Sequence, residues 1–311
     1  MERFDWKATI KVNIFSLWII GLWPKDDDIY KLSFYSLYAT ISVIFFMDCL
    51  GILQLINLFL VYSDFEELTE MTLICMSESL TLIKVYIFVK NMDLLKKLMA
   101  TLDSDIFQPK SLNQRMLIAS ALNNWKIIYN VFSIAGRPAR CLWIILPVLD
   151  GSKDFQLPMV VWYPYDIKSS PVYEITYLHQ VISICFILIA AYNIDMFISA
   201  LMMYVGAQCD ILCDNLRNLN ETNSGNFNKT VIDLIKHHKK ILSFAKNSNN
   251  FFNFILLAQF FASTLLIALV IFRLVLMSST NTRFYTFSFV VVFIMVQIFT
   301  YCWFGNEVEV K

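Results

Sequence analysis

The chain has 311 residues, of which 58% are hydrophobic, 15% are aromatic and only 16% are charged. A soluble domain of this length cannot bury that much apolar matter, so the composition predicts a membrane protein. The 25 basic and 25 acidic residues cancel, so the net charge indicates neither a nucleic acid nor an acidic macromolecule as a partner.

Six apolar segments are long enough to cross a bilayer of about 30 Å, because a helix rises about 1.5 Å per residue. They predict an all-α fold, a polytopic bundle of six transmembrane helices in the lipid bilayer. Residues 1–32 precede the first segment and include a short apolar stretch, Ile14 to Trp23, which we expect to lie at the membrane interface or to re-enter it. The predicted spans are residues 33–62, 68–89, 124–149, 173–203, 252–277 and 284–303.

Lysine and arginine are distributed unevenly over the segments outside these spans. In chain order the seven segments hold five, none, five, two, six, one and one of them. The positive-inside rule therefore predicts a cytoplasmic N-terminus. Residues 90–123 and 204–251 are then cytoplasmic, residues 150–172 form an extracellular loop, and residues 304–311 form a cytoplasmic C-terminus.

The cytoplasmic segments carry helical patterns of their own. Apolar residues recur at steps of three and four after span four and before span five, which predicts a cytoplasmic helical hairpin that extends both spans. His237 and His238 would point about 100° apart on a helix, so they are poor ligands for one metal, and we expect both to face solvent or loops. The stripes are Val205, Cys209, Leu212, Leu216 and Leu219, then Val231, Leu234, His238, Ile241 and Ala245, with Leu94, Leu95, Leu98 and Leu102 suggesting a third extension after span two.

The chain contains no motif that carries catalysis. GxSxG, GxGxxG, P-loop, HExxH and CxxC patterns are all missing from the sequence. Asp48 and Asp195 lie inside spans, but an intramembrane aspartyl protease would need a GxGD context, and Asp195 sits in NIDMF. The sequence therefore predicts a protein that is not an enzyme, with no cofactor and no metal site.

Ionisable side chains inside a bilayer are costly and are usually paired or functional. Arg137 and Arg140 flank a proline that would kink span three, and Glu78 is their expected partner. Either a hydrated cavity at the kink or a structural ion pair satisfies this pattern. Lys84 and Arg273 are expected to extend toward the inner and outer membrane faces. The intramembrane polar residues are Asp48, Glu78, Arg137, Arg140 and Asp195.

A ligand pocket is predicted from residue types on the outer halves of spans two, three, four and six. Aromatic side chains and methionines with a few hydroxyl groups suit small apolar molecules. The same residue types also occupy core or lipid-facing positions, so both interpretations stay open. The candidates are Met71, Met76, Ser79, Trp143, Tyr177, Phe186, Tyr285, Phe289 and Phe293.

Several motifs resemble those of the insect odorant receptor family. LPMVVWYPYDIKSSPVYEITYLHQ, residues 157–180, is similar to the stretch before the fourth helix of that family. HHKKILSF, residues 237–244, and QIFTYCWFGNEV, residues 297–308, resemble its fifth helix start and its sixth helix end. The residues that carry the resemblance are Trp162, Tyr163, Pro164, Asp166, Pro171, Tyr173, Asp195, Gln208, Cys302 and Gly305.

The resemblance implies a small volatile odorant as the ligand, bound among the outer halves of helices two, three, four and six. It also implies an odorant co-receptor, assembly into a tetrameric cation channel through a platform of helices four to seven, and the plasma membrane of an olfactory neuron dendrite. The family's seventh helix lines the pore, and the chain ends in FTYCWFGNEVEVK before such a helix. We therefore expect a truncated gene product. A gustatory-type receptor of the same superfamily and a multi-span solute transporter are the alternatives, although a transporter would predict an inverted repeat.

Overall fold

The computed structural model describes residues 3–24, 34–60, 65–149, 156–221, 227–277 and 282–311. Within these ranges the chain is helical and has no strand, so the predicted all-α fold with helical extensions is confirmed. The elements are α1 Lys7–Ile19, α2 Phe34–Ser42, a π-helical turn η1 Val43–Asp48, α3 Cys49–Leu60, α4 Phe65–Lys90, α5 Met92–Leu102, η2 Asp105–Phe107, α6 Leu112–Leu149, α7 Val172–Arg217, η3 Asn218–Glu221, α8 Phe227–Leu276 and α9 Thr282–Val310.

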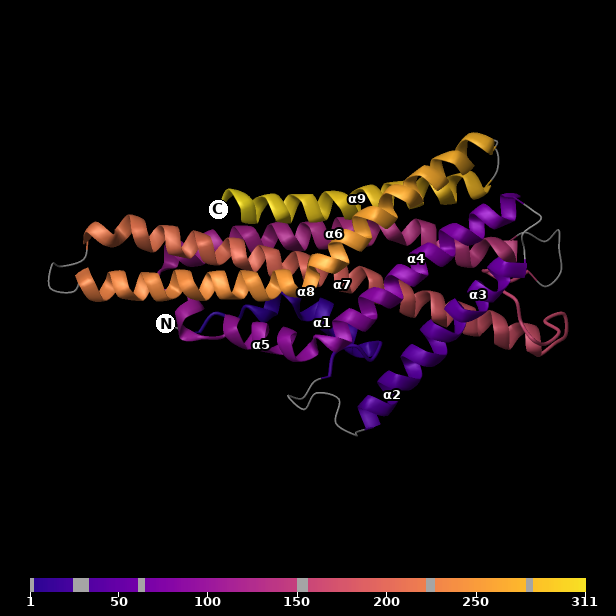
Figure 1. The fold of residues 1–311 in the computed structure, drawn as a ribbon, viewed down its shortest axis with the longest axis horizontal. Helices are drawn as coiled ribbons and strands as arrows, with labels where there is room; N and C mark the ends of the chain where they lie inside the picture. The colour runs from indigo at the N-terminus through magenta and orange to yellow at the C-terminus, as the bar shows by residue number, and fades with distance from the viewer. Residues whose placement is uncertain (1–2, 25–33, 61–64, 150–155, 222–226, 278–281) are drawn as a thin grey trace.

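Helix α7 is the centre of the molecule and packs against α1, α4, α6, α8 and α9. Figure 1 shows the long helices running along one axis, with the adjoining ends of α7 and α8 at one extremity. The segment of α2, η1 and α3 runs obliquely at the lower right, with η1 packed on α7 and α3 on α4, and both chain termini lie toward the hairpin end. Short connections between long helices favour such antiparallel neighbours.

Five helical stretches of the described chain are long and apolar enough to cross a membrane: residues 34–60, 68–90, 172–217, 227–276 and 284–310. The remaining predicted span, residues 124–149, lies within α6, and the side chains of residues 136–143 and 146–149 fall outside the described part. A membrane bundle of the predicted kind is therefore the architecture, and α6 supplies the helix at the position of the third predicted span.

Helix α1 lies against α7 and holds the N-terminal segment on the bundle. The side-chain amide of Asn13 donates to the carbonyl oxygen of Asn193 at 2.9 Å, and both residues are buried. Helix α1 ends at Ile19, and the turn that follows contains Gly21, whose φ of +85° is left-handed. The amide of Leu22 closes this turn on the carbonyl of Leu17 at 2.8 Å. A Cβ at Gly21 would come within 2.7 Å of the Ala39 backbone, so glycine lets α2 approach.

The helices that begin as spans continue well beyond the predicted boundaries. Helix α7 runs unbroken to Arg217 and α8 begins at Phe227. Helix α6 starts at Leu112, twelve residues before the predicted span. Helix α9 continues to Val310, seven residues beyond the predicted end of the sixth span, and Lys311 pairs with Asp210 of α7 at 2.7 Å.

The expectation that His237 faces solvent or a loop is wrong. Its ring nitrogen Nε2 lies 3.0 Å from the amide oxygen of Gln208, its ring contacts Phe107, and its side chain is buried. His238, its neighbour, is exposed. The buried stripe of α8 has the predicted steps of three and four but a different phase, since it includes Leu234, His237, Ile241, Phe244 and Ser248.

Candidate functional site

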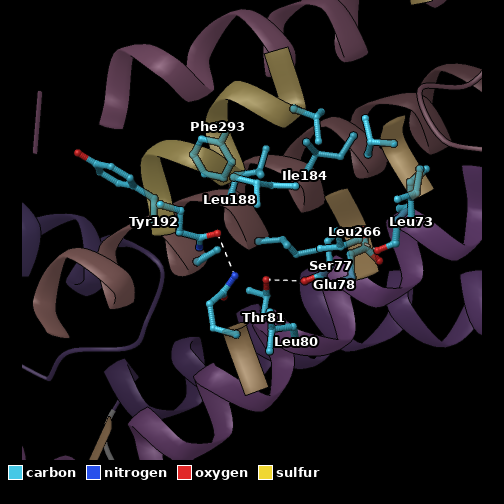
Figure 2. A pocket seen from close by; sticks show the side chains of 18 of the residues that line it. Leu73, Ser77, Glu78, Leu80, Thr81, Ile184, Leu188, Tyr192, Leu266 and Phe293 are labelled. Carbon is cyan, nitrogen blue, oxygen red and sulfur yellow. Dashed lines mark hydrogen bonds between the residues drawn. The ribbon is translucent and has the colours of Figure 1, made fainter. Parts of the chain in front are cut away.

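A cavity of about 220 Å³ lies between α4, α7, α8 and α9. Its walls are mostly leucine, isoleucine, valine and phenylalanine, and Figure 2 shows Phe293, Leu188 and Ile184 across the space from Glu78, Thr81 and Leu266. Binding sites for small molecules are typically apolar with a few polar groups, and drug-sized ligands occupy about 300–1,000 Å³. This cavity therefore suits a smaller molecule.

One face of α4 supplies four of the polar side chains of the cavity, and Gln259 of α8 and Gln297 of α9 supply two more. Ser77, Glu78, Thr81 and Lys84 follow one another at helical spacing and all line it. The Ser77 hydroxyl donates to the carbonyl of Ile74 at 2.9 Å, and the Thr81 hydroxyl donates to the carbonyl of Ser77 at 2.9 Å, a bond drawn in Figure 2. Both hydroxyl hydrogens are thus used, so these oxygens present only acceptor lone pairs to a ligand.

A buried ion pair closes the end of the cavity nearest the α7–α8 hairpin. Lys84 Nζ lies 2.6 Å from Asp195 Oδ1, and both side chains are only 2% exposed. The amide of Gln297 on α9 donates to the other Asp195 oxygen, and Gln259 on α8 donates to Gln297 at 2.9 Å. The expectation that Lys84 extends to the membrane face is wrong, because a carboxylate 111 positions away in the sequence neutralises it inside the bundle.

Glu78 sits between this ion pair and the apolar end of the cavity. It is 5% exposed, and neither carboxyl oxygen has a hydrogen-bond partner among the described residues. The amide of Gln54 on α3 faces the same carboxyl, and one of its two N–H groups donates to Met159 Sδ at 3.0 Å. Sequence reasoning marked Glu78 as a partner for arginine and did not assign it to a pocket.

The segment 156–171 reaches the cavity through Met159 and is fixed to the start of α7. The Gln180 side chain accepts a hydrogen bond from the Met159 amide at 2.9 Å and donates to its carbonyl at 3.1 Å. Gln180 also donates to the hydroxyl of Tyr163 at 3.1 Å. The hydroxyl of Tyr173 donates to the carbonyl of Gln156 at 2.7 Å. Two of the predicted motif residues therefore hold this segment in place over α7.

The other motif residues are spread over the molecule. Trp162, Pro164, Asp166 and Pro171 lie on the exposed side of the segment, where Asp166 accepts a bond from the Lys168 amide at 2.9 Å. Gln208 is buried far along α7 and donates to the carbonyl of Phe107 at 3.1 Å as well as contacting His237. Cys302 is exposed on α9, and a side chain at Gly305 would meet nothing within 4 Å.

Of the nine residues predicted for the ligand pocket, Phe293 lines this cavity. Met71 is buried nearby, with Sδ accepting from the Asn57 amide at 3.4 Å. The Tyr177 hydroxyl donates to the carbonyl of Ile144 at 2.6 Å, and Phe186 stacks beside Phe46. Met76 packs in a small apolar cluster of α4, α8 and α9. Ser79 is half-buried, Tyr285 and Phe289 are exposed, and the side chain of Trp143 lies outside the described part.

The other intramembrane charges have separate positions. Asp48 ends the π-helical turn and is partly exposed, while the side chains of Arg137 and Arg140 lie outside the described part. Arg273 is 3% exposed and pairs with Glu70 at 3.5 Å, so a carboxylate of α4 neutralises it inside the bundle. Among the described residues, no three histidine, cysteine, aspartate or glutamate side chains gather closely enough to hold a metal ion.

Comparisons with known proteins agree on one family. A family profile described as 7tm Odorant receptor matches residues 64–311. The chain is 22% identical to Odorant receptor Or1 of Anopheles gambiae over 352 residues, covering 99% of this chain and 80% of that protein. It is 21% identical to Odorant receptor 46a, isoform A, of Drosophila melanogaster over 296 residues, covering 93% and 76%.

Solved structures share the fold. The olfactory receptor OR5 of Machilis hrabei superimposes with a TM-score of 0.84 at 19% identity, over 97% of this chain and 80% of that one. The same receptor in complex with eugenol gives 0.83 at 18% identity, with the same coverage. The family match favours an odorant receptor over the gustatory-type receptor and the solute transporter, and it places the chain among receptors rather than enzymes. Because the profile match spans well over half of its length, the chain belongs to the 7tm odorant receptor family.

Proposed function

We propose that the cavity between α4, α7, α8 and α9 is the odorant site of this receptor. The observation that carries the proposal is a space of about 220 Å³ with largely apolar walls and a few polar groups, most of them on one face of α4. An apolar ligand there exchanges water or lipid contacts for close dispersion contacts with leucine, isoleucine and phenylalanine side chains. The Machilis receptor that was solved with eugenol shares the fold and supports a small organic ligand.

The site is also suited to gating. Four helices line it, and at its inner end the Lys84–Asp195 pair is joined through Gln297 to α9 and through Gln259 to α8. A ligand that fits one arrangement of these helices better than another shifts their equilibrium by that difference in affinity. We propose that this shift, in a complex with an odorant co-receptor, opens a cation channel in the plasma membrane of an olfactory neuron dendrite.

The topology proposed for the complex has a cytoplasmic N-terminus and a cytoplasmic α7–α8 hairpin. The excess of lysine and arginine at these ends supports it. An epitope tag placed before Met1 should bind antibody only after the cell is permeabilised. Labelling of intact cells would contradict this orientation.

Two experiments test the function. The full chain, expressed with a co-receptor, should give odorant-evoked currents above those of the co-receptor expressed by itself. Replacing Ala191, which lines the cavity, by tryptophan fills the space and should lower odorant potency about tenfold or more. The matched control is Leu178→Trp on the exposed face of the same helix, which should keep its potency. Equal responses from both variants would contradict the site.

Equilibrium binding separates ligand recognition from channel opening. The purified chain in lipid nanodiscs should bind small volatile molecules, with eugenol as the first probe, and Ala191→Trp should weaken that binding. Binding without current would retain the odorant site and reject gating by this assembly. Unchanged eugenol affinity in Ala191→Trp would reject the site itself.

A further inference from the structure

We propose that Glu78 makes this receptor selective for amines, namely small ligands that carry a basic nitrogen on an apolar body. The inference rests on the proposed function, because it requires that the ligand occupy the cavity between α4, α7, α8 and α9. It adds the chemical class of the ligand and the residue that recognises it.

The first step is the charge balance of the cavity. Lys84 is matched by Asp195 at 2.6 Å, and Arg273, near the opposite end, is matched by Glu70 at 3.5 Å. Glu78 has no such partner among the described residues, although it is 5% exposed and lies in the cavity wall. A buried carboxyl group without a partner costs free energy, which a ligand that brings a cation removes.

The second step is the hydrogen-bonding character of the polar groups around Glu78. Ser77 and Thr81 have each donated their hydrogen to a backbone carbonyl. The Gln54 amide, which faces Glu78, uses one of its two N–H groups on Met159. Beside Glu78 the cavity wall therefore presents the Ser77 and Thr81 oxygens only as acceptors. A protonated primary amine supplies three N–H donors, whereas an alcohol supplies one O–H and a ketone or ester supplies none. The site is complementary to the amine.

The third step is the shape of the remaining space. Leu73, Leu266, Ile184, Leu188 and Phe293 surround the polar face, as Figure 2 shows, so an alkyl or aryl body can pack while its nitrogen reaches Glu78. An amine that enters the cavity as the uncharged base takes its proton from the carboxyl group of Glu78. One O–H bond breaks and one N–H bond forms, which leaves an ammonium–carboxylate pair without any further reactant.

The test uses three ligands of nearly equal size on the full chain in lipid nanodiscs: 2-phenylethylamine, 2-phenylethanol and propylbenzene. The wild type should bind the amine about tenfold more tightly than the alcohol, or better, because hydrogen bonds to charged groups are the stronger ones. Glu78→Gln should remove that advantage and leave the affinities for the alcohol and the hydrocarbon within about threefold. Glu174→Gln, an exposed carboxylate in the first turn of α7 outside the cavity, is the matched control and should behave as wild type.

A series of ligands tested on the wild-type chain does not depend on whether any variant folds. Adding methyl groups to the nitrogen of 2-phenylethylamine removes its N–H donors one by one, and affinity should fall at each step. Amine preference that survives Glu78→Gln, or equal wild-type affinity for the amine and the alcohol, would overturn the inference while leaving the odorant site intact. If none of the three ligands binds, the proposed function fails and the inference with it.

Discussion

The two halves of α7 have opposite surroundings. From Tyr192 to Gln208 every residue of the helix is buried, including Asp195, Ser199 and Gly206. Between Val172 and Ala191 the buried residues fall on one face, and the cavity opens beside that face. We call residues 192–208 the inner half, which neighbouring helices enclose on all sides, and residues 172–191 the outer half, which is packed on one side only.

Helix α7 therefore combines a structurally constrained segment with a segment that can respond to a ligand. A helix with only one buried face can shift or rotate at low cost, whereas a segment enclosed on every side moves only together with its neighbours. The Lys84–Asp195 ion pair lies at the boundary between the inner and outer halves of α7. A ligand beside the outer half therefore contacts α7 next to its enclosed segment. A small displacement of the helix at this position can be transmitted along α7 to the α7–α8 hairpin.

The largest expected effect is at that boundary. Lys84→Met leaves the Asp195 carboxylate buried without its cation and should destabilise the protein by about 3–5 kcal/mol, read as a fall in the melting temperature in nanodiscs. Lys236→Met is the matched control, because its pair with Asp233 is exposed, and it should change stability by no more than about 0.5 kcal/mol. Equal losses from both variants would mean that the buried pair does not hold the inner half of α7 in place. The double variant Lys84→Met with Asp195→Leu should recover much of the loss.

The enclosed half should also be intolerant of lost volume. Phe197 is fully buried and packs on Trp23 and Phe88 at centroid distances of 5.4 and 5.7 Å. Phe197→Ala should cost about 3 kcal/mol, because the surrounding aromatic rings cannot collapse into the space. The same thermal melt measures it, with Leu178→Ala on the exposed outer half of α7 as the control. A cost as small as that of the control would remove the distinction between the two halves.

The packing around the inner half of α7 should weaken in acid through His237. Burial, then Lys110 and His238, lower the pKa of His237 from 6.5 to about 4. The neutral form is favoured in the folded state, so its contribution is complete above pH 6.5 and is lost as the pH falls toward 4, at up to about 1.4 kcal/mol per pH unit. Melting temperature measured between pH 7.5 and 4 should show this slope. His237→Gln should flatten it and His238→Gln, an exposed neighbour, should not; the opposite pattern would contradict the assignment.

The smallest effect is expected in the cavity wall. Leu188→Ala borders space that already exists, so it should cost about 1 kcal/mol or less. The enlarged cavity should shift ligand preference toward molecules longer by one or two methylene groups, since one methylene in an apolar pocket is worth about 1–3 kcal/mol. Affinities for a homologous series of alkylbenzenes, compared with those of Leu178→Ala, measure the shift. An unchanged size preference would place the ligand elsewhere.

The helical architecture was accessible from the sequence because it depends on local patterns. Runs of apolar residues set the spans, and steps of three and four after span four and before span five correctly indicated long helical extensions. The ends of the helices were harder to predict from the sequence. Helix α9 continues through a charged stretch to Val310 because the last residues find partners, as Lys311 does with Asp210 and Glu307.

The partners of buried polar groups were not accessible, because they come from distant parts of the chain. Lys84 and Asp195 were both recognised as intramembrane charges, yet nothing local joins positions 111 apart. His237 is buried because Gln208 and Phe107 approach from other elements. Residue type placed the pocket among aromatic side chains, of which Phe293 lines the cavity, while its other walls are leucine and isoleucine that a sequence does not distinguish from ordinary core.

The central claim is that the odorant lies in the cavity between α4, α7, α8 and α9. Electron cryomicroscopy of the full chain with a bound amine, assembled with its co-receptor if that complex forms, tests it most directly. We expect ligand density in this cavity, with the ligand nitrogen within hydrogen-bond distance of Glu78 and the ligand body against Phe293. Density outside this cavity, for example beside Tyr177 and Tyr285, with the space around Glu78 empty, would contradict it.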